Sequence, residues 1–127
     1  MAEPSKFQPS SLRGEIVKLA DLPRYQPPGH TGTTNVLLVE ASFNGHFELV
    51  LGTLDPGGEA ERHHHSRESQ VIYILAGQAR VTLGNGEPQT CGPETVIRIP
   101  PRVDHEVVSL GPDPLRLMIV YSPPLAR

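Results

Sequence analysis

The chain has 127 residues and a formal net charge of −3, with 37% hydrophobic and 20% charged residues. This composition excludes a disordered chain, and its length predicts a single domain. The absence of a basic excess argues against nucleic acid as the main partner. The sequence therefore predicts a globular domain that does not act on nucleic acid.

The first 34 residues are rich in proline and polar side chains. Ile16-Val17-Lys18-Leu19 is long enough for a short strand, whereas residues 23–34 are dense in Pro, Gly and Thr and are expected to be irregular. We therefore interpret residues 1–34 as an N-terminal arm with a possible edge strand and residues 35–127 as a barrel. The arm shows no apolar secretory segment, and no apolar run reaches membrane-spanning length, so no membrane is expected as a partner.

From residue 35 onward, short apolar runs alternate with turn residues. The chain contains 14 Pro and 12 Gly, which favour turns over helix interiors. Asp55-Pro56-Gly57-Gly58 and Asn85-Gly86 are strong turn sequences. The pattern predicts eight short strands and an all-β sandwich or barrel, at residues 35–40, 47–54, 61–65, 70–75, 79–83, 95–99, 106–110 and 115–121.

A histidine cluster is the most informative part of the sequence. On a strand, His63 and His65 point to one face and His64 to the other. Two imidazoles on the inner face of a barrel can reach one metal ion, although three adjacent histidines are also compatible with a solvated loop. Gln70 shares its strand parity with inward-facing residues, and His105 follows Pro100-Pro101, so both are candidates for further ligands.

The spacing of these residues resembles the two motifs of small single-domain cupins. Gly57, His63, His65, Gln70 and Gly77 lie at the positions of the first motif, with Gln70 in the place usual for Glu. Pro100, His105 and Ser109 follow the spacing of the second motif, in which Glu94, Arg102 and Ser109 replace its two glycines and its asparagine.

This resemblance implies a double-stranded β-helix, that is, a jelly-roll-like barrel, often a homodimer. It also implies one divalent metal ion held by His63, His65, Gln70 and His105, with Glu68 as the rival of Gln70. Imidazole ligands suit Zn, Ni, Fe, Mn or Cu, and the sequence does not select among them. A His-His-Gln-His set is similar to that of pectin-degradation cupins, which open unsaturated uronates to linear keto sugars.

Four neutral ligands leave the full charge on a divalent ion and favour an anionic, oxygen-rich ligand. We therefore expect non-redox isomerase, lyase or cyclase chemistry by Lewis-acid polarisation. An Fe-dependent, quercetinase-like dioxygenase and a non-catalytic binding or sensing cupin remain alternatives.

Candidates for substrate contact lie outside the motifs. Arg98, inside an apolar strand, is a candidate for binding a substrate carboxylate, or else points outward to pair with an acid. His30 lies in the arm, over a barrel mouth or in an exposed loop. Glu68 and His30 are the candidates for a catalytic base, and no catalytic residue is assigned. Cys91, the one cysteine, is compatible with a reducing, cytoplasmic location.

Overall fold

The computed structural model describes residues 14–126, and it is built almost entirely from strands. A 3-10 helix η1 (Leu19–Asp21) precedes the sheet, and one short helix, α1 (Ala41–Asn44), joins β2 to β3. The strands are β1 (Arg24–Tyr25), β2 (His30–Val39), β3 (Glu48–His63), β4 (Ser69–Ala76), β5 (Ala79–Leu83), β6 (Gln89–Cys91), β7 (Val96–Ile99), β8 (His105–Ser109) and β9 (Leu115–Ser122).

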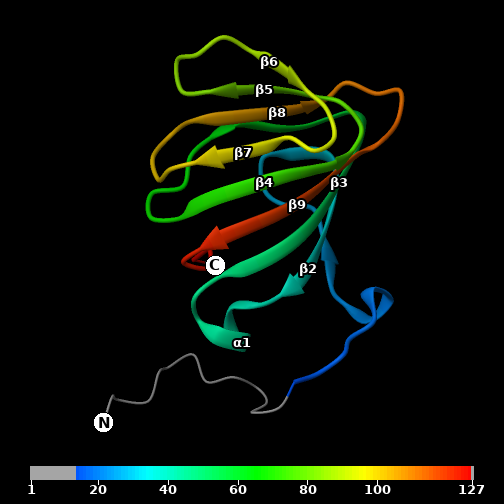
Figure 1. Ribbon diagram of the computed structural model, residues 1–127, viewed down its shortest axis with the longest axis vertical. Coiled ribbons are helices and arrows are strands. Elements are labelled where there is room, and N and C mark those ends of the chain that lie inside the picture. The colour runs from blue at the N-terminus through cyan, green and yellow to red at the C-terminus, as the bar shows by residue number, and fades with distance from the viewer. Residues whose placement is uncertain (1–13, 127) are drawn as a thin grey trace.

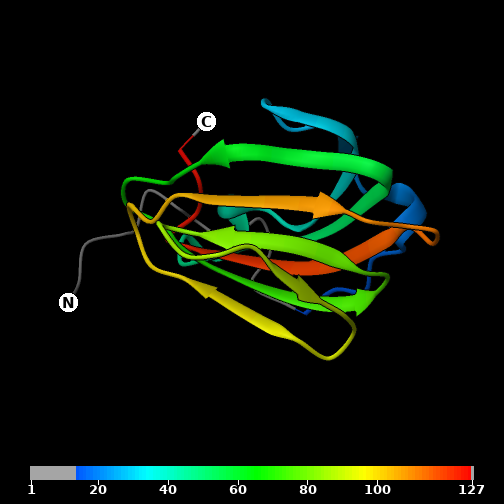
Figure 2. The ribbon, with the colours of Figure 1, turned by 90° about the horizontal axis from the view of Figure 1, so that it is seen from above.

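These strands form one curled antiparallel sheet in the order β6-β5-β8-β3-β9-β4-β7, with β2 against β3 and β1 against β2 (Figures 1 and 2). The expected all-β barrel of jelly-roll type is confirmed. Alternate residues of each strand point inward because successive side chains on a strand face opposite sides. Val50, Ile72, Ile74, Leu115 and Leu117 belong to the resulting aliphatic core.

The long strand β3 joins the two parts of the sheet. Its residues 48–54 pair with β9, whereas its residues 59–63 pair with β8. The strand end expected at residues 55–58 is therefore wrong, since β3 continues through them; they form an irregularity between Leu54 and Glu59, which pair with β2. Gly57 has φ +83°, and a Cβ on Gly58 would lie 2.8 Å from the Gly32 carbonyl oxygen, so the two glycines allow a bend at close approach to β2.

The N-terminal region differs from the expectation in two respects. The strand expected at residues 16–19 is absent: this segment is exposed, and η1 begins at Leu19. Residues 23–34 are not wholly irregular, because β1 pairs with β2 and β2 begins at His30. Part of the expected arm thus contributes strands to the sheet, while residues 1–13 lie outside the described residues.

Within residues 14–126, no helix is long and apolar enough to cross a membrane.

Candidate metal centre

Three histidines meet at one end of the barrel. His63 ends β3 and lies directly opposite His105, the first residue of β8, with ring centroids 4.3 Å apart. His65 follows β3 in irregular chain, and its ring lies 5.0 Å from that of His63 and 5.5 Å from that of His105. One ring nitrogen from each of the three histidines lies within 4.8 Å of the other two. The structure therefore brings together three imidazoles in a grouping that can hold one metal ion.

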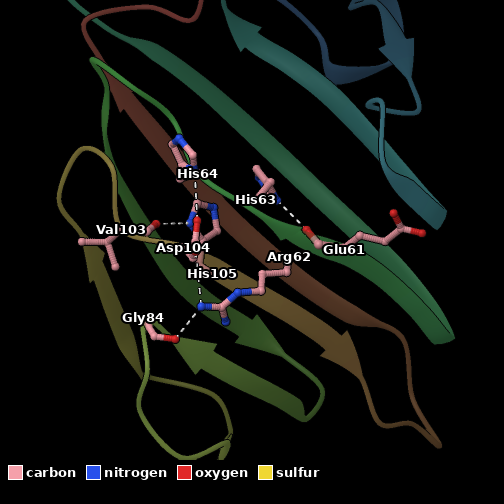
Figure 3. A network of polar contacts seen from close by, with 8 residues as sticks. All are labelled: Glu61, Arg62, His63, His64, Gly84, Val103, Asp104 and His105. Carbon is pink, nitrogen blue, oxygen red and sulfur yellow. Dashed lines mark hydrogen bonds and ion pairs between the residues drawn. The ribbon is translucent and has the colours of Figure 1, made fainter.

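Backbone carbonyls orient two of these rings (Figure 3). Nδ1 of His63 lies 2.6 Å from the carbonyl oxygen of Glu61, and Nδ1 of His105 lies 3.0 Å from that of Val103. Because a carbonyl oxygen only accepts hydrogen bonds, each Nδ1 donates, and each neutral ring keeps its lone pair on Nε2. Hydrogen bonds of this kind fix the tautomer of metal-binding histidines.

Burial keeps the rings of His65 and His105 neutral. It lowers the pKa of His105 to about 4, because desolvation disfavours the charged imidazolium, and the neighbouring His63 and His65 lower this pKa further. Desolvation also lowers the pKa of His65. Buried Nε2 atoms of His65 and His105 have no hydrogen-bond partner. The site therefore presents unpaired lone pairs at neutral pH, which is the form that binds a metal ion.

His65 is held by the segment that precedes β8. Its carbonyl oxygen accepts a 2.7 Å hydrogen bond from the backbone N–H of Arg102, whose φ is +66°. Glu94 also has a positive φ, of +67°. These are the two positions where the cupin motif carries glycine. Glu94 and Arg102 therefore adopt the left-handed backbone conformation although neither is a glycine.

Gln70 adds an oxygen to the same end of the barrel. Its side chain is only 5% exposed, and its Nε2 donates to the hydroxyl oxygen of Tyr121 across 3.3 Å. The carbonyl Oε1 is buried and has no partner. Gln70 lines an inner hollow of about 30 Å³ together with His63 and His105. The residues present thus fit a divalent ion, with an amide oxygen as a ligand beside three imidazoles.

Glu68, the rival of Gln70, has a different environment. It is buried, and its carboxylate accepts a 3.3 Å hydrogen bond from the backbone N–H of Arg67. Its charge opposes, in part, the burial that lowers the pKa of His65. Glu68 does not line the hollows beside the histidines.

His30, expected in the arm, is the first residue of β2 and borders the cluster. Its ring centroid lies 6.3 Å from that of His63. Thr33 donates its hydroxyl to the Thr31 carbonyl, so this hydroxyl oxygen accepts a 3.1 Å hydrogen bond from Nδ1 of His30. The lone pair of His30 is therefore on Nε2. Burial, followed by the neighbouring His63, lowers the pKa of His30 to about 4.

Three other basic side chains lie outside the cluster. His64 is exposed and pairs with Asp104 at 2.9 Å, and Arg62 contacts the other oxygen of Asp104 at 3.3 Å (Figure 3). Arg98 on β7 is exposed between the buried Ile97 and Ile99, and it lines a separate hollow. The structure does not bring Arg98 to the histidines, because strand alternation places its side chain on the outer face.

The sequence analysis missed Asn35. This residue is buried on β2 and lines the inner hollow and an outer cavity of about 500 Å³, which also share His30, His63 and Tyr121. Strand parity would have indicated Asn35, since Thr33, Asn35 and Leu37 alternate on one face. The predicted strand begins only at Asn35, so Thr33 and the face that it shares with Asn35 lie outside it, whereas β2 begins at His30.

Comparison with known proteins identifies the domain. The family model described as "Cupin domain" matches residues 50–121. An uncharacterised protein, MJ1618 of Methanocaldococcus jannaschii, is 29% identical over 71 residues, and this match covers 56% of either chain. The aligned part thus spans little more than half of that relative.

Solved structures share the same fold. An RmlC-like cupin from Shewanella frigidimarina is 26% identical, with a TM-score of 0.72 over 91% of this chain and 94% of that one. KdgF from Halomonas sp. is 23% identical, with a TM-score of 0.72 over 86% and 94% of the two chains. The polyketide cyclase RemF from Streptomyces resistomycificus is 24% identical, with a TM-score of 0.75 over 87% and 80%.

Proposed function

The chain belongs to the cupin domain family, and on that premise we propose that it is a metal-dependent protein acting on a small anionic molecule. One divalent ion would be bound by four side chains: His63, His65, Gln70 and His105. The observation that carries this proposal is the set of buried, unpaired acceptors at one place: Nε2 of His65, Nε2 of His105 and Oε1 of Gln70. Buried polar atoms without partners are rare in folded proteins, and a metal ion satisfies all three.

The donor set favours an anionic oxygen ligand. Three neutral imidazoles and an amide contribute no negative charge, so a dication in this buried site attracts an anion such as an enolate or a carboxylate. A divalent ion bound there supplies Lewis-acid polarisation of a substrate oxygen. The same neutral donors disfavour oxidation of the ion, because oxidation would increase the positive charge of the site. We therefore propose non-redox isomerase, lyase or cyclase chemistry.

His30 is the group we assign to proton transfer. It lines both the inner hollow and the outer cavity, and its Nε2 lone pair is available while Nδ1 donates to Thr33. A neutral imidazole at a cavity wall can accept a proton from a carbon or hydroxyl next to a polarised carbonyl. Glu68 has no such position, since it does not line either hollow.

We also propose that the protein is a homodimer. Val71, Tyr73 and Leu75 on β4 and Val96 on β7 are exposed apolar side chains of neighbouring strands, and Tyr73 lies opposite Val96. A continuous apolar patch of this kind is typical of an interaction surface. A second copy that presents the same patch would cover it.

The experiment is metal analysis of the untagged protein, followed by thermal unfolding with and without added Zn²⁺, Ni²⁺, Mn²⁺ or Fe²⁺. We expect near-stoichiometric metal and a metal-dependent rise in Tm, both lost in His105→Ala and both retained in His46→Ala, which removes an exposed histidine. Failure of every ion to bind would overturn the metal site and leave a binding cupin.

The reaction class is tested separately on the metal-loaded protein. Oxygen uptake is measured with catechols and flavonols. No consumption is expected, and stoichiometric consumption with iron would replace the proposal by a dioxygenase.

A further inference from the structure

We propose that the substrate is a small, mainly apolar molecule bearing a hydroxy-ketone or enol, and that Asn35 positions it through its side-chain amide. This inference rests on the proposed function and deepens it by naming the substrate class. Enols with an apolar body and polyhydroxylated sugar acids both offer an anionic oxygen, and the site favours the enols.

Asn35 is a buried amide that lacks a partner for its oxygen. Its side chain is 4% exposed, and Oδ1 has no hydrogen bond. Gly52 on β3 lies opposite Asn35, and a Cβ there would come within 3.0 Å of Oδ1. The glycine thus leaves room for this amide on the inner face. Because an amide offers both donors and an acceptor, Asn35 can bind a substrate oxygen at the cavity wall.

The outer cavity has predominantly apolar walls. Tyr25, Pro27, Pro28, Leu125 and Ala126 line it together with His30, Asn35, His63, His65 and Tyr121. Among residues 14–126, no lysine or arginine lines this cavity or the inner hollow. Sugar hydroxyls that face the proline, leucine and alanine side chains would lose their water without gaining partners there, which is unfavourable. An apolar ring would bury its surface there instead.

The C-terminal segment that lines the cavity is hydrogen-bonded to the sheet. The backbone N–H of Leu125 donates to the carboxylate of Glu48, a buried residue at the start of β3, across 2.5 Å. Leu125 also packs against the hydrophobic core. The apolar wall is therefore held by the same strand that carries His63, and it forms part of the binding site.

The charge of the substrate is then confined to one end. His63, His65, His105 and Gln70 surround the place for the metal ion, and the other polar groups common to both hollows are His30, the amide of Asn35 and the hydroxyl of Tyr121, which already accepts a hydrogen bond from Gln70. A single anionic enol oxygen at the metal end with a neutral second oxygen near Asn35 matches this distribution. A second carboxylate in the substrate has no cationic partner among the described residues of either hollow.

The test uses two pyranones with the same metal-binding hydroxy-ketone. Allomaltol carries a methyl group where kojic acid carries a hydroxymethyl group. Binding of each, and of D-galacturonate, to Zn²⁺-loaded protein is measured by calorimetry and compared with its affinity for free Zn²⁺. After that correction, we expect allomaltol to bind at least about fivefold more tightly than kojic acid and more tightly still than galacturonate. Equal or reversed preference would overturn the substrate class.

The role of Asn35 is tested with Asn35→Ala and with Asn35→Leu, which preserves side-chain volume. Both should bind allomaltol about tenfold more weakly at unchanged zinc content, while Gln89→Ala, which removes an exposed amide on β6, should bind normally. Unchanged affinity in both Asn35 variants refutes the positioning role and leaves the metal site intact. A wild-type protein that holds no zinc refutes the proposed function, and this inference with it.

Arg127 lies outside the described residues and provides the control for charge. Arg127→Ala should leave the order of the three probes unchanged. If wild-type protein prefers galacturonate and Arg127→Ala loses that preference, a cation serves the substrate and the apolar-enol assignment is wrong.

Discussion

Gln70 and Tyr121 lie directly opposite each other on β4 and β9, and the Gln70 amide nitrogen donates to the Tyr121 hydroxyl oxygen across 3.3 Å. This contact determines which end of the amide is free. With the nitrogen engaged by Tyr121, the oxygen Oε1 is left buried beside the histidines without a partner. The pair therefore presents an acceptor to the proposed ion where an unrestrained amide could rotate.

Gln70→Glu should increase the retention of a divalent ion. The substitution replaces a neutral oxygen by a carboxylate. Two unit charges about 4 Å apart attract each other by about 4 kcal/mol at the effective dielectric of a protein, and a dication at ligand distance attracts a carboxylate more strongly, less the cost of desolvation. We expect at least about tenfold slower metal loss to a chelator, measured by competition. Gln89→Glu adds the same charge on the exposed strand β6 and should leave retention unchanged.

The same variant tests the charge argument for catalysis. Lower net charge at the ion weakens its attraction for an anionic substrate, so binding of enol probes should decrease although the metal is held more tightly. A variant that binds both metal and probe more tightly would contradict the importance of the neutral donor set.

Tyr121→Phe should loosen the Gln70 amide without removing it. The loss of one buried hydrogen bond costs about 0.5–1.5 kcal/mol of folding free energy, measured by denaturant unfolding. Metal retention should fall severalfold, because Oε1 is no longer held toward the histidines. A loss of stability with unchanged retention would show that Tyr121 supports only the fold.

Gly77→Ala should be strongly destabilising. Gly77 has φ +86°, and a Cβ would lie 2.5 Å from the Pro114 carbonyl oxygen. Gly57 has a similar φ of +83°, but nothing lies within 4 Å of a Cβ there. Both alanine variants incur the cost of a left-handed backbone, about 1–2 kcal/mol, and Gly77→Ala adds about 1–3 kcal/mol of overpacking. Urea unfolding of the two variants measures the difference, and equal losses would refute the close contact.

Tyr73→Lys should convert the proposed dimer to a monomer. Tyr73 is 38% exposed in the single chain and lies at the centre of the apolar patch formed with Val71, Leu75 and Val96. A lysine there places a charge in the interface, where its desolvation has no compensation. Light scattering with size-exclusion chromatography gives the mass. Arg80→Lys on the exposed face of β5 serves as the control, and a wild-type monomer would refute the dimer.

The sequence by itself determined the fold class and the composition of the histidine cluster. Strands at residues 79–83 and 115–121 follow from period-two alternation and flanking turn residues, which are local properties of the chain. The spacing of His63, His65 and His105 carries the resemblance to cupins. These residues needed no tertiary information, because motif spacing and strand parity depend only on position along the chain.

Only the tertiary structure decided how β3 runs and what lines the cavity. The local turn propensity of Asp55-Pro56-Gly57-Gly58 produces only an irregularity within β3, because the flanking residues Leu54 and Glu59 pair with β2 and Glu59 also pairs with β8. The pairing of Gln70 with Tyr121 and the burial of Asn35 arise from strands far apart in sequence. The residues next to Arg98 in the sequence do not indicate which way its side chain points. The assembled sheet places that side chain on the outer face. Which face of a strand points inward is decided by the assembled sheet. A single strand with apolar residues on both faces does not indicate which face packs against the core.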